Sequence, residues 1–339
     1  MSDCPETTFR FQPWHVPAGP LVPGQALHRH LARLLKLDDE PLSMERIAHS
    51  TCVFLCRSRE PDHSVVCKFF AARENLPWPE ARALMLYEYR SLERLRRGGF
   101  RGPPFEVVQP LAVEEAAGCL LVEPFVPATD LDHTIGAAVS GAEAELFTRL
   151  NQLAGFLARL HGGHVLRRHI PFHRYCEDAR RILRSLAKAP DLSRDLLKSL
   201  EPLVRLWERE SERWTAETTL VHGDVTPTNF LFPEPGRLVV LDLERMRFAD
   251  PLLDVGFLTA ELRHHFALRV HCAERAEPFV RYFLDRYCEE REFAEPVRRQ
   301  WLERHRFFMA LGELRIARNP RLHPGHRGWL VEEALRCLR

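Results

Sequence analysis

Two acids and an amide lie close together in the sequence, at the two ends of one short stretch. Asp224 follows a glycine and precedes a Thr-Pro pair, so we expect it on a tight loop. Asn229 ends this loop, and Asp242 follows the apolar run 238–241. A loop carboxylate can face a hydroxyl, whereas an amide oxygen and a second carboxylate are ligands that magnesium accepts. This combination suits phosphoryl transfer, in which a metal neutralises charge on the phosphoryl oxygens.

The elements around these residues are predicted to bring them together. The apolar pair 220–221 leads into the loop, and residues 230–232 form a predicted strand. The Pro-Glu-Pro-Gly sequence at 233–236 then predicts a turn, after which the run 238–241 returns antiparallel. A hairpin of this kind places the second acid beside the amide.

A lysine and a glutamate each interrupt an apolar pattern farther towards the N-terminus. Lys68 is the only charge in the predicted strand 64–70, which is apolar on both faces. Glu88 lies on the apolar stripe of a helix predicted over 80–97, which a proline begins and two glycines end. An ammonium group is costly in apolar surroundings without an anionic partner, so we expect these two residues to pair.

Together these segments resemble the aminoglycoside phosphotransferase and choline kinase family, distant relatives of protein kinases. The resemblance covers about residues 42–320. It implies a two-lobed α+β, protein-kinase-like fold with ATP and Mg²⁺ as cofactors. The residues that match the family's motifs would be the catalytic base Asp224, the magnesium ligands Asn229 and Asp242, the phosphate-binding Lys68 and its partner Glu88. Glu244 matches a position where these kinases often carry an acid.

The rest of the nucleotide site follows only from position in the family's order. Ser50 and Thr51 lie where a kinase covers the phosphates, but no glycine occurs between residues 24 and 98. A plain hairpin turn explains this loop equally well. Glu123 and Phe125 flank Pro124 in a segment that resembles the hinge that pairs with adenine; because proline has no N–H, Phe125 or Val126 would be the donor.

The second lobe is predicted to be mostly helical. Helices are expected over residues 142–160, 177–187, 193–214, 257–272, 276–290, 296–316 and 328–338. The pair at 177–214 is inserted before the catalytic loop, as in the small-molecule kinases, where such a pair helps to wall the acceptor pocket. Asp254 matches a family residue that braces this loop, although it could instead cap a helix. The arginines and histidines of the last helices are expected to lie mostly on solvated faces.

Composition sets further limits. The 339 residues are 45% hydrophobic with a formal net charge of +1, which argues against a nucleic-acid partner and allows two lobes. No apolar run is long enough to span a membrane, and the first 14 residues lack a signal-peptide pattern, so we expect a cytoplasmic protein. The nine cysteines show no Cys-x-x-Cys spacing and are expected to be reduced. We expect residues 1–41 to form an arm and helix, 42–123 a nucleotide-binding lobe, and 124–339 a catalytic and acceptor-binding lobe.

The sequence therefore predicts an ATP- and Mg²⁺-dependent phosphotransferase that moves the γ-phosphoryl group to a hydroxyl of a small-molecule acceptor such as a sugar, an amino alcohol or an aminoglycoside-like compound. The alternatives are a kinase of a lipopolysaccharide or other glycan sugar, a kinase that acts on a protein surface, and a nucleotide-binding pseudokinase scaffold. The inserted helices argue against a protein substrate. Abundant arginine favours a neutral or anionic acceptor over a polycationic antibiotic.

Overall fold

The computed structural model divides the chain into two compact units. The first contains Met1–Ala128 and Val239–Glu244, and the second contains Thr129–Leu238 and Arg245–Arg339. The structure describes residues 19–23, 25–36, 41–47, 50, 52–58, 64–73, 75–163, 165–166, 171–211, 214 and 217–339. Within these ranges no helix is long and apolar enough to cross a membrane.

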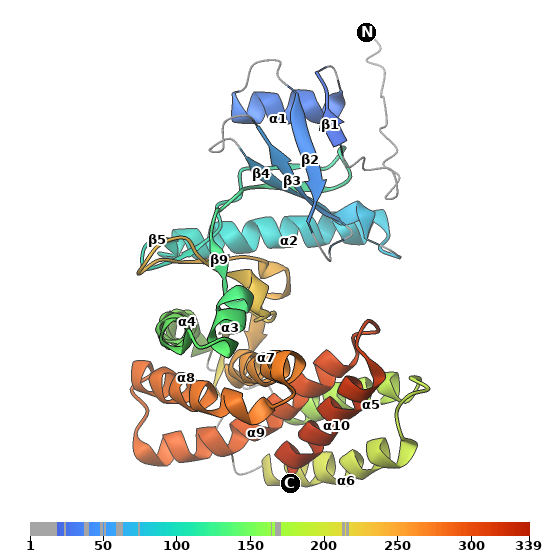
Figure 1. Ribbon diagram of the computed structural model, residues 1–339, viewed down its shortest axis with the longest axis vertical. Coiled ribbons are helices and arrows are strands. Elements are labelled where there is room, and N and C mark those ends of the chain that lie inside the picture. The colour runs from blue at the N-terminus through green and yellow to red at the C-terminus, as the bar shows by residue number, and fades with distance from the viewer. Residues whose placement is uncertain are drawn as a thin grey trace. The chain divides into compact units, whose positions relative to one another are not determined.

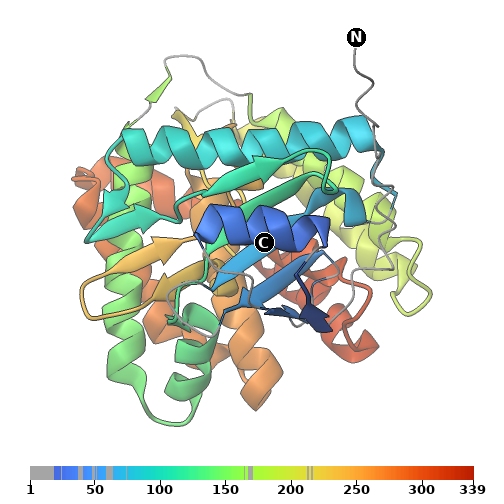
Figure 2. The ribbon, with the colours of Figure 1, turned by 90° about the horizontal axis from the view of Figure 1, so that it is seen from above.

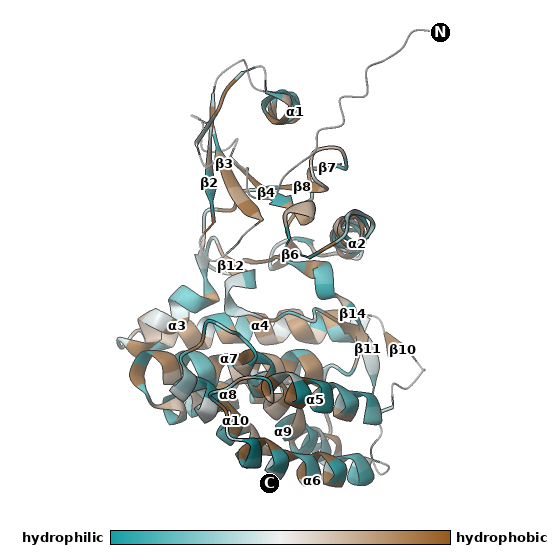
Figure 3. Ribbon diagram, turned by 90° about the vertical axis from the view of Figure 1, so that its right-hand side faces the viewer, coloured by the Kyte–Doolittle hydropathy of each residue, from teal (hydrophilic) through white to brown (hydrophobic). Residues whose placement is uncertain are grey.

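A six-stranded antiparallel sheet forms the centre of the first unit (Figure 1). Its strands, in spatial order, are β1 (Gly19–Leu21), β2 (Leu42–Arg46), β3 (Val53–Arg57), β4 (Val65–Phe69), β8 (Leu120–Pro124) and β7 (Ala112–Glu114). The core beneath it includes Met44, Phe54, Cys67 and Val122. Hydrophobic colouring gathers on β3 (Figure 3), as expected for a strand with neighbours on both sides.

Two helices accompany this sheet. Helix α1 (Ala26–Leu35) lies across the strands (Figure 2) and contributes Leu31 to the same core. Helix α2 (Trp78–Arg97) has Pro79 in its first turn and ends at Gly98, whose N–H donates to the Arg94 carbonyl at 3.0 Å. The short 3-10 helix Phe70–Ala72 connects β4 to α2. Lys68 therefore lies near the end of β4, and Glu88 lies in the middle of α2.

The sequence predicts a hairpin whose strands cover 105–113 and 118–123, and the first of these two strands is wrong. This stretch divides into β6 (Phe105–Val107), which pairs with β5 (Arg101–Gly102), and β7, which belongs to the central sheet. Pro110 lies between the two strands and has no N–H to continue a ladder. The Val108 N–H instead donates to the Val240 carbonyl of β13 (Leu238–Val240) at 3.0 Å.

The second unit is mostly helical, as the sequence predicts. Its helices are α3 (Leu131–Val139), α4 (Glu143–Gly163), α5 (His173–Leu186), α6 (Arg194–Glu210), α7 (Leu252–Val270), α8 (Glu277–Glu290), α9 (Glu295–Ala317) and α10 (Pro324–Leu338). Helix α7 begins at Leu252, five residues before its predicted start, and the Asp250 side chain accepts the Leu252 N–H at 3.0 Å. In Figure 3, α5 and α6 carry long hydrophilic stretches, which fits helices with one solvent-facing side.

Short strands support the loop 222–229 within this unit. The buried strand β11 (Thr218–Val221) pairs with β10 (Val165–Leu166) and with β14 (Arg247–Ala249). The strand β12 (Phe230–Phe232) follows the loop and pairs with β9 (Thr129–Asp130). The loop therefore begins and ends in hydrogen-bonded strands.

Helices α7 and α9 pack unusually closely because two glycines lie at their contact. A Cβ atom at Gly256 would lie 2.5 Å from the Phe308 backbone, and one at Gly312 would lie 2.8 Å from the Ala260 Cβ atom. Real side-chain atoms do not approach so closely, so only glycine fits at these two positions without displacing a helix.

Candidate active site

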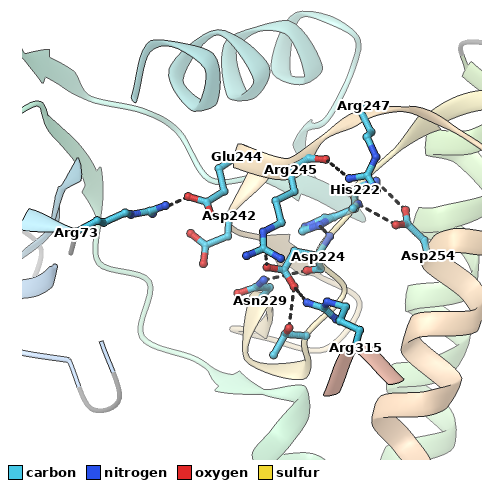
Figure 4. A network of polar contacts seen from close by, with 12 residues as sticks. Arg73, His222, Asp224, Asn229, Asp242, Glu244, Arg245, Arg247, Asp254 and Arg315 are labelled. Atoms are coloured by element: carbon cyan, nitrogen blue, oxygen red, sulfur yellow. Dashed lines mark hydrogen bonds and ion pairs between the residues drawn. The ribbon is translucent and has the colours of Figure 1, made fainter. Parts of the chain in front are cut away.

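The loop after β11 is fixed by a buried carboxylate. Asp254, in the first turn of α7, accepts the backbone N–H groups of His222 at 2.7 Å and Gly223 at 2.8 Å (Figure 4). It is fully buried, as is His161 at the end of α4, whose Nε2 atom lies 3.1 Å from the same carboxylate. The bracing role predicted for Asp254 is confirmed by these contacts, and the first N–H of α7 is accepted by Asp250 instead.

The pKa of Asp254 reflects two opposing effects. Burial alone would raise this pKa, because it penalises the charged form. The bonds from His161 and Gly223 favour the carboxylate, and together with the nearby His222 ring they hold the pKa of Asp254 below its usual value. A carboxylate that stays ionised in the core can keep accepting both loop amides.

Gly223 allows the loop to turn against the chain that follows β13. Its φ of +82° lies in the left-handed region, and a Cβ atom there would lie 2.3 Å from the Arg245 carbonyl oxygen. A larger residue is excluded by both the conformation and the space. The glycine thus sets the direction in which Asp224, the next residue, leaves the strand.

Asp224 lies within a set of polar side chains that the sequence did not predict. The Arg315 guanidinium donates to its Oδ1 atom at 2.5 Å, and the Arg245 Nε atom lies 3.5 Å from Oδ2 (Figure 4). The Thr226 hydroxyl also donates to Oδ1 at 2.9 Å. Asn229 donates its side-chain amide N–H to the Asp224 carbonyl at 2.9 Å, so its amide oxygen remains the atom able to act as a ligand. The structure therefore brings Asp224 and Asn229 together in one loop.

The first unit brings together the four other ionisable residues proposed from sequence. The Lys68 ammonium donates to Glu88 Oε1 at 2.8 Å, lies 3.1 Å from Glu123 Oε2, and forms a hydrogen bond with Asp242. Lys68, Glu88 and Glu123 are buried, whereas the Asp242 side chain is 42% exposed. Three carboxylates thus surround a single ammonium group.

Burial and the surplus of negative charge together shift the pKa of each buried member. Burial opposes the charged form of Lys68, but Asp242, Glu123 and Glu88 outweigh it and raise the lysine pKa. Burial is also the main reason that the pKa of Glu88 rises to about 8 and that of Glu123 rises, with Lys68 opposing both shifts. Among the described residues, Glu88 Oε2 and Glu123 Oε1 are buried without a hydrogen-bond partner. The group can therefore accommodate an additional positive charge.

Asp242 has an uncommon backbone conformation for a residue with a side chain. Its φ is +56°, in the left-handed region that costs most residues free energy. The nearby acid Glu244 accepts a hydrogen bond from the Arg73 guanidinium at 2.6 Å. Strain of this kind concentrates at functional sites, and here it turns a carboxylate predicted to hold magnesium.

Of the three other residues predicted to bind the nucleotide, two use their polar groups for hydrogen bonds within the chain. The Ser50 hydroxyl accepts the Cys52 and Val53 N–H groups at 3.3 and 3.1 Å, so it closes its own turn. Thr51 lies outside the described residues. The Phe125 N–H donates to the Ser64 carbonyl at 3.0 Å, which leaves Val126 as the hinge donor of the two residues considered.

The expectation that the arginines of the last helices lie on solvated faces is wrong for several of them. Arg315 contacts the loop carboxylate, Arg304 is buried in an ion pair with Asp250, and Arg263 contacts Glu277 and Glu333. Arginine can enter the interior because its planar guanidinium is weakly hydrated and satisfies several acceptors at once.

The spacing of α9 held a signal for Arg315. Phe308, Leu311, Arg315 and Arg318 recur at intervals of three and four residues, so they share one face of the helix. A charge on an apolar stripe predicts a buried anionic partner, by the same reasoning that paired Lys68 with Glu88.

Comparison with known proteins identifies the family. The sequence model of the phosphotransferase enzyme family matches residues 53–301, most of the chain. The chain belongs to this family. It is therefore a phosphotransferase, as the sequence predicts. No curated protein matches the sequence.

Several solved structures share the fold of this chain. Choline kinase LicA from Streptococcus pneumoniae is 17% identical, with a TM-score of 0.60 over 92% of this chain and 97% of that one. The gentamicin complex of APH(2")-IIa is 15% identical, with a TM-score of 0.58 over 93% and 97%. Glucosamine kinase in complex with glucosamine, ADP and inorganic phosphate is 20% identical, with a TM-score of 0.57 over 93% and 83%. These matches confirm the predicted two-lobed α+β fold.

Proposed function

We propose that the protein transfers the γ-phosphoryl group of MgATP to a hydroxyl of a small-molecule acceptor. The observation that carries this proposal is the loop carboxylate of Asp224, held by the bonds from Asp254 to the loop backbone in a chain of the phosphotransferase family. Similar structures include kinases of choline and glucosamine, which are small hydroxylated molecules. A carboxylate in such a loop can orient a hydroxyl and accept its proton.

The reaction would proceed in one displacement. A bond forms between the acceptor oxygen and the γ-phosphorus, while the bond from that phosphorus to the β–γ bridging oxygen breaks and ADP leaves. The acceptor's hydroxyl proton passes to Asp224. In the described geometry this carboxylate is already bonded to Arg315 and Thr226, which fixes its position before an acceptor binds.

The first unit would hold the nucleotide phosphates and the second unit would supply the base. Lys68 is the proposed phosphate ligand, with Glu88 fixing its ammonium group. Asp242 and Asn229 are the proposed magnesium ligands, and a bound Mg²⁺ would neutralise charge on the phosphates. The three carboxylates around Lys68 and the two buried oxygens without partners support a cation beside this cluster.

Replacement of the base tests the central assignment. We expect Asp224→Asn to lower kcat by a factor of about 10² to 10⁴, because the acceptor hydroxyl loses its proton acceptor. The affinity for ATP, measured by calorimetry, should stay close to that of the unmodified protein. Asp195→Asn is the control, since this side chain is 94% exposed on α6. Full turnover in Asp224→Asn would remove the catalytic role of this residue.

A second variant tests the metal. Asp242→Ala should make ATP affinity insensitive to magnesium, because this residue is the only charged ligand proposed. Calorimetric titration of ATP with and without MgCl₂ measures the effect. An unchanged magnesium dependence would exclude Asp242 as a ligand. A chain that binds MgATP but phosphorylates no hydroxylated compound would instead favour the pseudokinase scaffold.

A further inference from the structure

Five of the eleven residues that line a small cavity beside the Asp224 loop are arginines. It lies entirely within the second unit, has a volume of about 150 Å³, and is bounded by Gly223 of the loop and by residues of α5, α7 and α9. Its charged lining residues are Asp178, Arg181, Arg245, Arg247, Arg315 and Arg318. Because Arg245 and Arg315 also contact Asp224, the cavity lies within one side-chain length of the proposed base.

The charge of this arginine cavity is positive even after the neighbouring acids are counted. Arg181 is paired with Asp178 at 2.5 Å, and Arg315 contacts both Asp224 at 2.5 Å and Glu261 at 3.5 Å. Five guanidinium groups meet these three carboxylates, which leaves an excess of two positive charges.

Two of the arginines have no carboxylate partner among the residues that the structure describes. Arg247 donates to the Arg245 carbonyl at 3.3 Å, but neither Arg247 nor Arg318 has a carboxylate partner within the described ranges. Both residues are exposed. Guanidinium groups with free N–H donors are the side chains that bind carboxylate and phosphate oxygens in a bidentate manner.

We propose that the acceptor is a small hydroxylated molecule that carries an oxyanion, either a carboxylate or a phosphate ester, and that Arg247, Arg315 and Arg318 bind this group. The inference rests on the proposed phosphotransferase reaction, since it places the acceptor between the arginine cavity and Asp224. Because Arg245 and Arg315 contact both the cavity and Asp224, one small molecule can present its oxyanion to the arginines and its hydroxyl to the base. An ammonium-bearing acceptor would instead meet the repulsion of several guanidinium groups.

The contact between Arg315 and Asp224 connects oxyanion binding to the base. The same guanidinium that would bind the acceptor's oxyanion now donates to Asp224 Oδ1. An oxyanion on Arg315 competes with Asp224 for this donor and frees the carboxylate oxygen for the acceptor's hydroxyl proton. A neutral acceptor cannot compete in this way, so charge on the acceptor contributes to turnover as well as to affinity.

A matched set of acceptors tests the proposal. Full-length protein with MgATP is assayed for ADP formation with glucose, glucuronate, glucose 6-phosphate and glucosamine, and with glycerol, glycerate and glycerol phosphate. We expect kcat/KM for the anionic members to exceed that of their neutral counterparts by about tenfold or more, since a charge-assisted hydrogen bond contributes on this scale. Preference for glucuronate and glycerate would identify a carboxylate, and preference for the two esters a phosphate. Preference for glucosamine or a neutral member would overturn the proposal.

A binding measurement separates this inference from the proposed reaction. Calorimetric titration with inorganic phosphate and with acetate compares the unmodified chain with the double variant Arg247→Gln, Arg318→Gln. We expect the variant to lose about tenfold or more in affinity for one of the two anions, while Arg299→Gln, an exposed arginine on α9 outside the cavity, binds as before. Equal affinities in the double variant and the unmodified chain would overturn the oxyanion site. Anion binding that needs these arginines, without phosphorylation of any acceptor, would keep the site and reject the proposed reaction.

Discussion

Replacement of Asp254 by asparagine tests whether one buried carboxylate holds the loop that carries Asp224. The carboxylate offers one oxygen to the Gly223 N–H and the other to the His222 N–H and His161. An asparagine side chain has only one acceptor oxygen, and its NH₂ group would face an N–H donor on the other side. At least one backbone amide would then be buried without a partner.

The size of the effect follows from these contacts. A hydrogen bond to a charged group contributes about 1.5–3 kcal/mol, and an unsatisfied buried donor costs about 1–3 kcal/mol. We therefore expect Asp254→Asn to lower the free energy of unfolding by about 3 kcal/mol, which most domains survive. Displacement of Asp224 by about 1 Å would lower kcat by about 10²-fold, because phosphoryl transfer depends on the alignment of the hydroxyl.

Urea denaturation followed by circular dichroism measures the stability, and ADP formation measures kcat. The matched control is Asp285→Asn on α8, because this acid is 41% exposed and forms a surface ion pair with Arg298 at 2.6 Å. Exposed pairs contribute about 0–1 kcal/mol, so the control should change little. If Asp254→Asn altered stability by less than about 0.5 kcal/mol and left kcat unchanged, the bracing role would be wrong.

Two further predictions concern a loop glycine and a buried histidine. Gly223→Ala should abolish turnover and lower the stability measured by denaturant titration by more than Gly236→Ala does. Both glycines have φ near +80°, so the conformational cost of alanine is similar. Only at Gly223 would the added Cβ meet neighbouring atoms within 4 Å, the nearest being the Arg245 carbonyl oxygen. Similar losses in the two variants would reject close approach as the reason for the loop glycine. His305 accepts or donates one hydrogen bond with Thr259 at 2.8 Å, and burial lowers its pKa to about 4. In the unfolded chain this histidine has a pKa near 6.5, so it binds a proton at a higher pH than in the folded chain. The contribution of His305 to the free energy of unfolding is therefore complete above about pH 6.5. It falls as the pH drops towards 4, by about 2 kcal/mol between pH 7 and pH 5. His305→Gln should lose this part of the pH dependence in urea titrations, and an identical pH profile would refute the assignment.

The sequence predicted the pairs that depend on a charge within an apolar pattern. Lys68 and Glu88 each interrupt an apolar surface, and burial makes any partner other than the opposite charge costly. The Asp254 brace was also predictable, because its place in the order of motifs resembles that of its family. For Lys68 and Glu88 the local pattern already contains the physical reason for the contact, whereas the prediction for Asp254 rests on the resemblance alone.

Other features depend on tertiary geometry that spacing does not encode. The strand expected up to residue 113 was divided because β6 and β7 belong to different sheets, a choice that Pro110 permits but does not by itself dictate. The partner of Arg315 lies 91 residues away in sequence, and several arginines of α9 are equivalent in charge. Helix periodicity identifies the face that Arg315 shares with Leu311, but it cannot choose which acid of the chain meets that face.

The close glycine contact between α7 and α9 limits how Arg315 can move. With Gly256 and Gly312 at the contact, a slide or a separation of the two helices would open a void in a well-packed interior. Arg315 can therefore leave Asp224 only by rotation about its own side-chain bonds. Such rotations take picoseconds to nanoseconds, far less than a typical catalytic cycle. The exchange of the Arg315 guanidinium between Asp224 and the acceptor's oxyanion would then stay at equilibrium throughout turnover. Progress curves should therefore begin linearly, without a lag when the acceptor is first added.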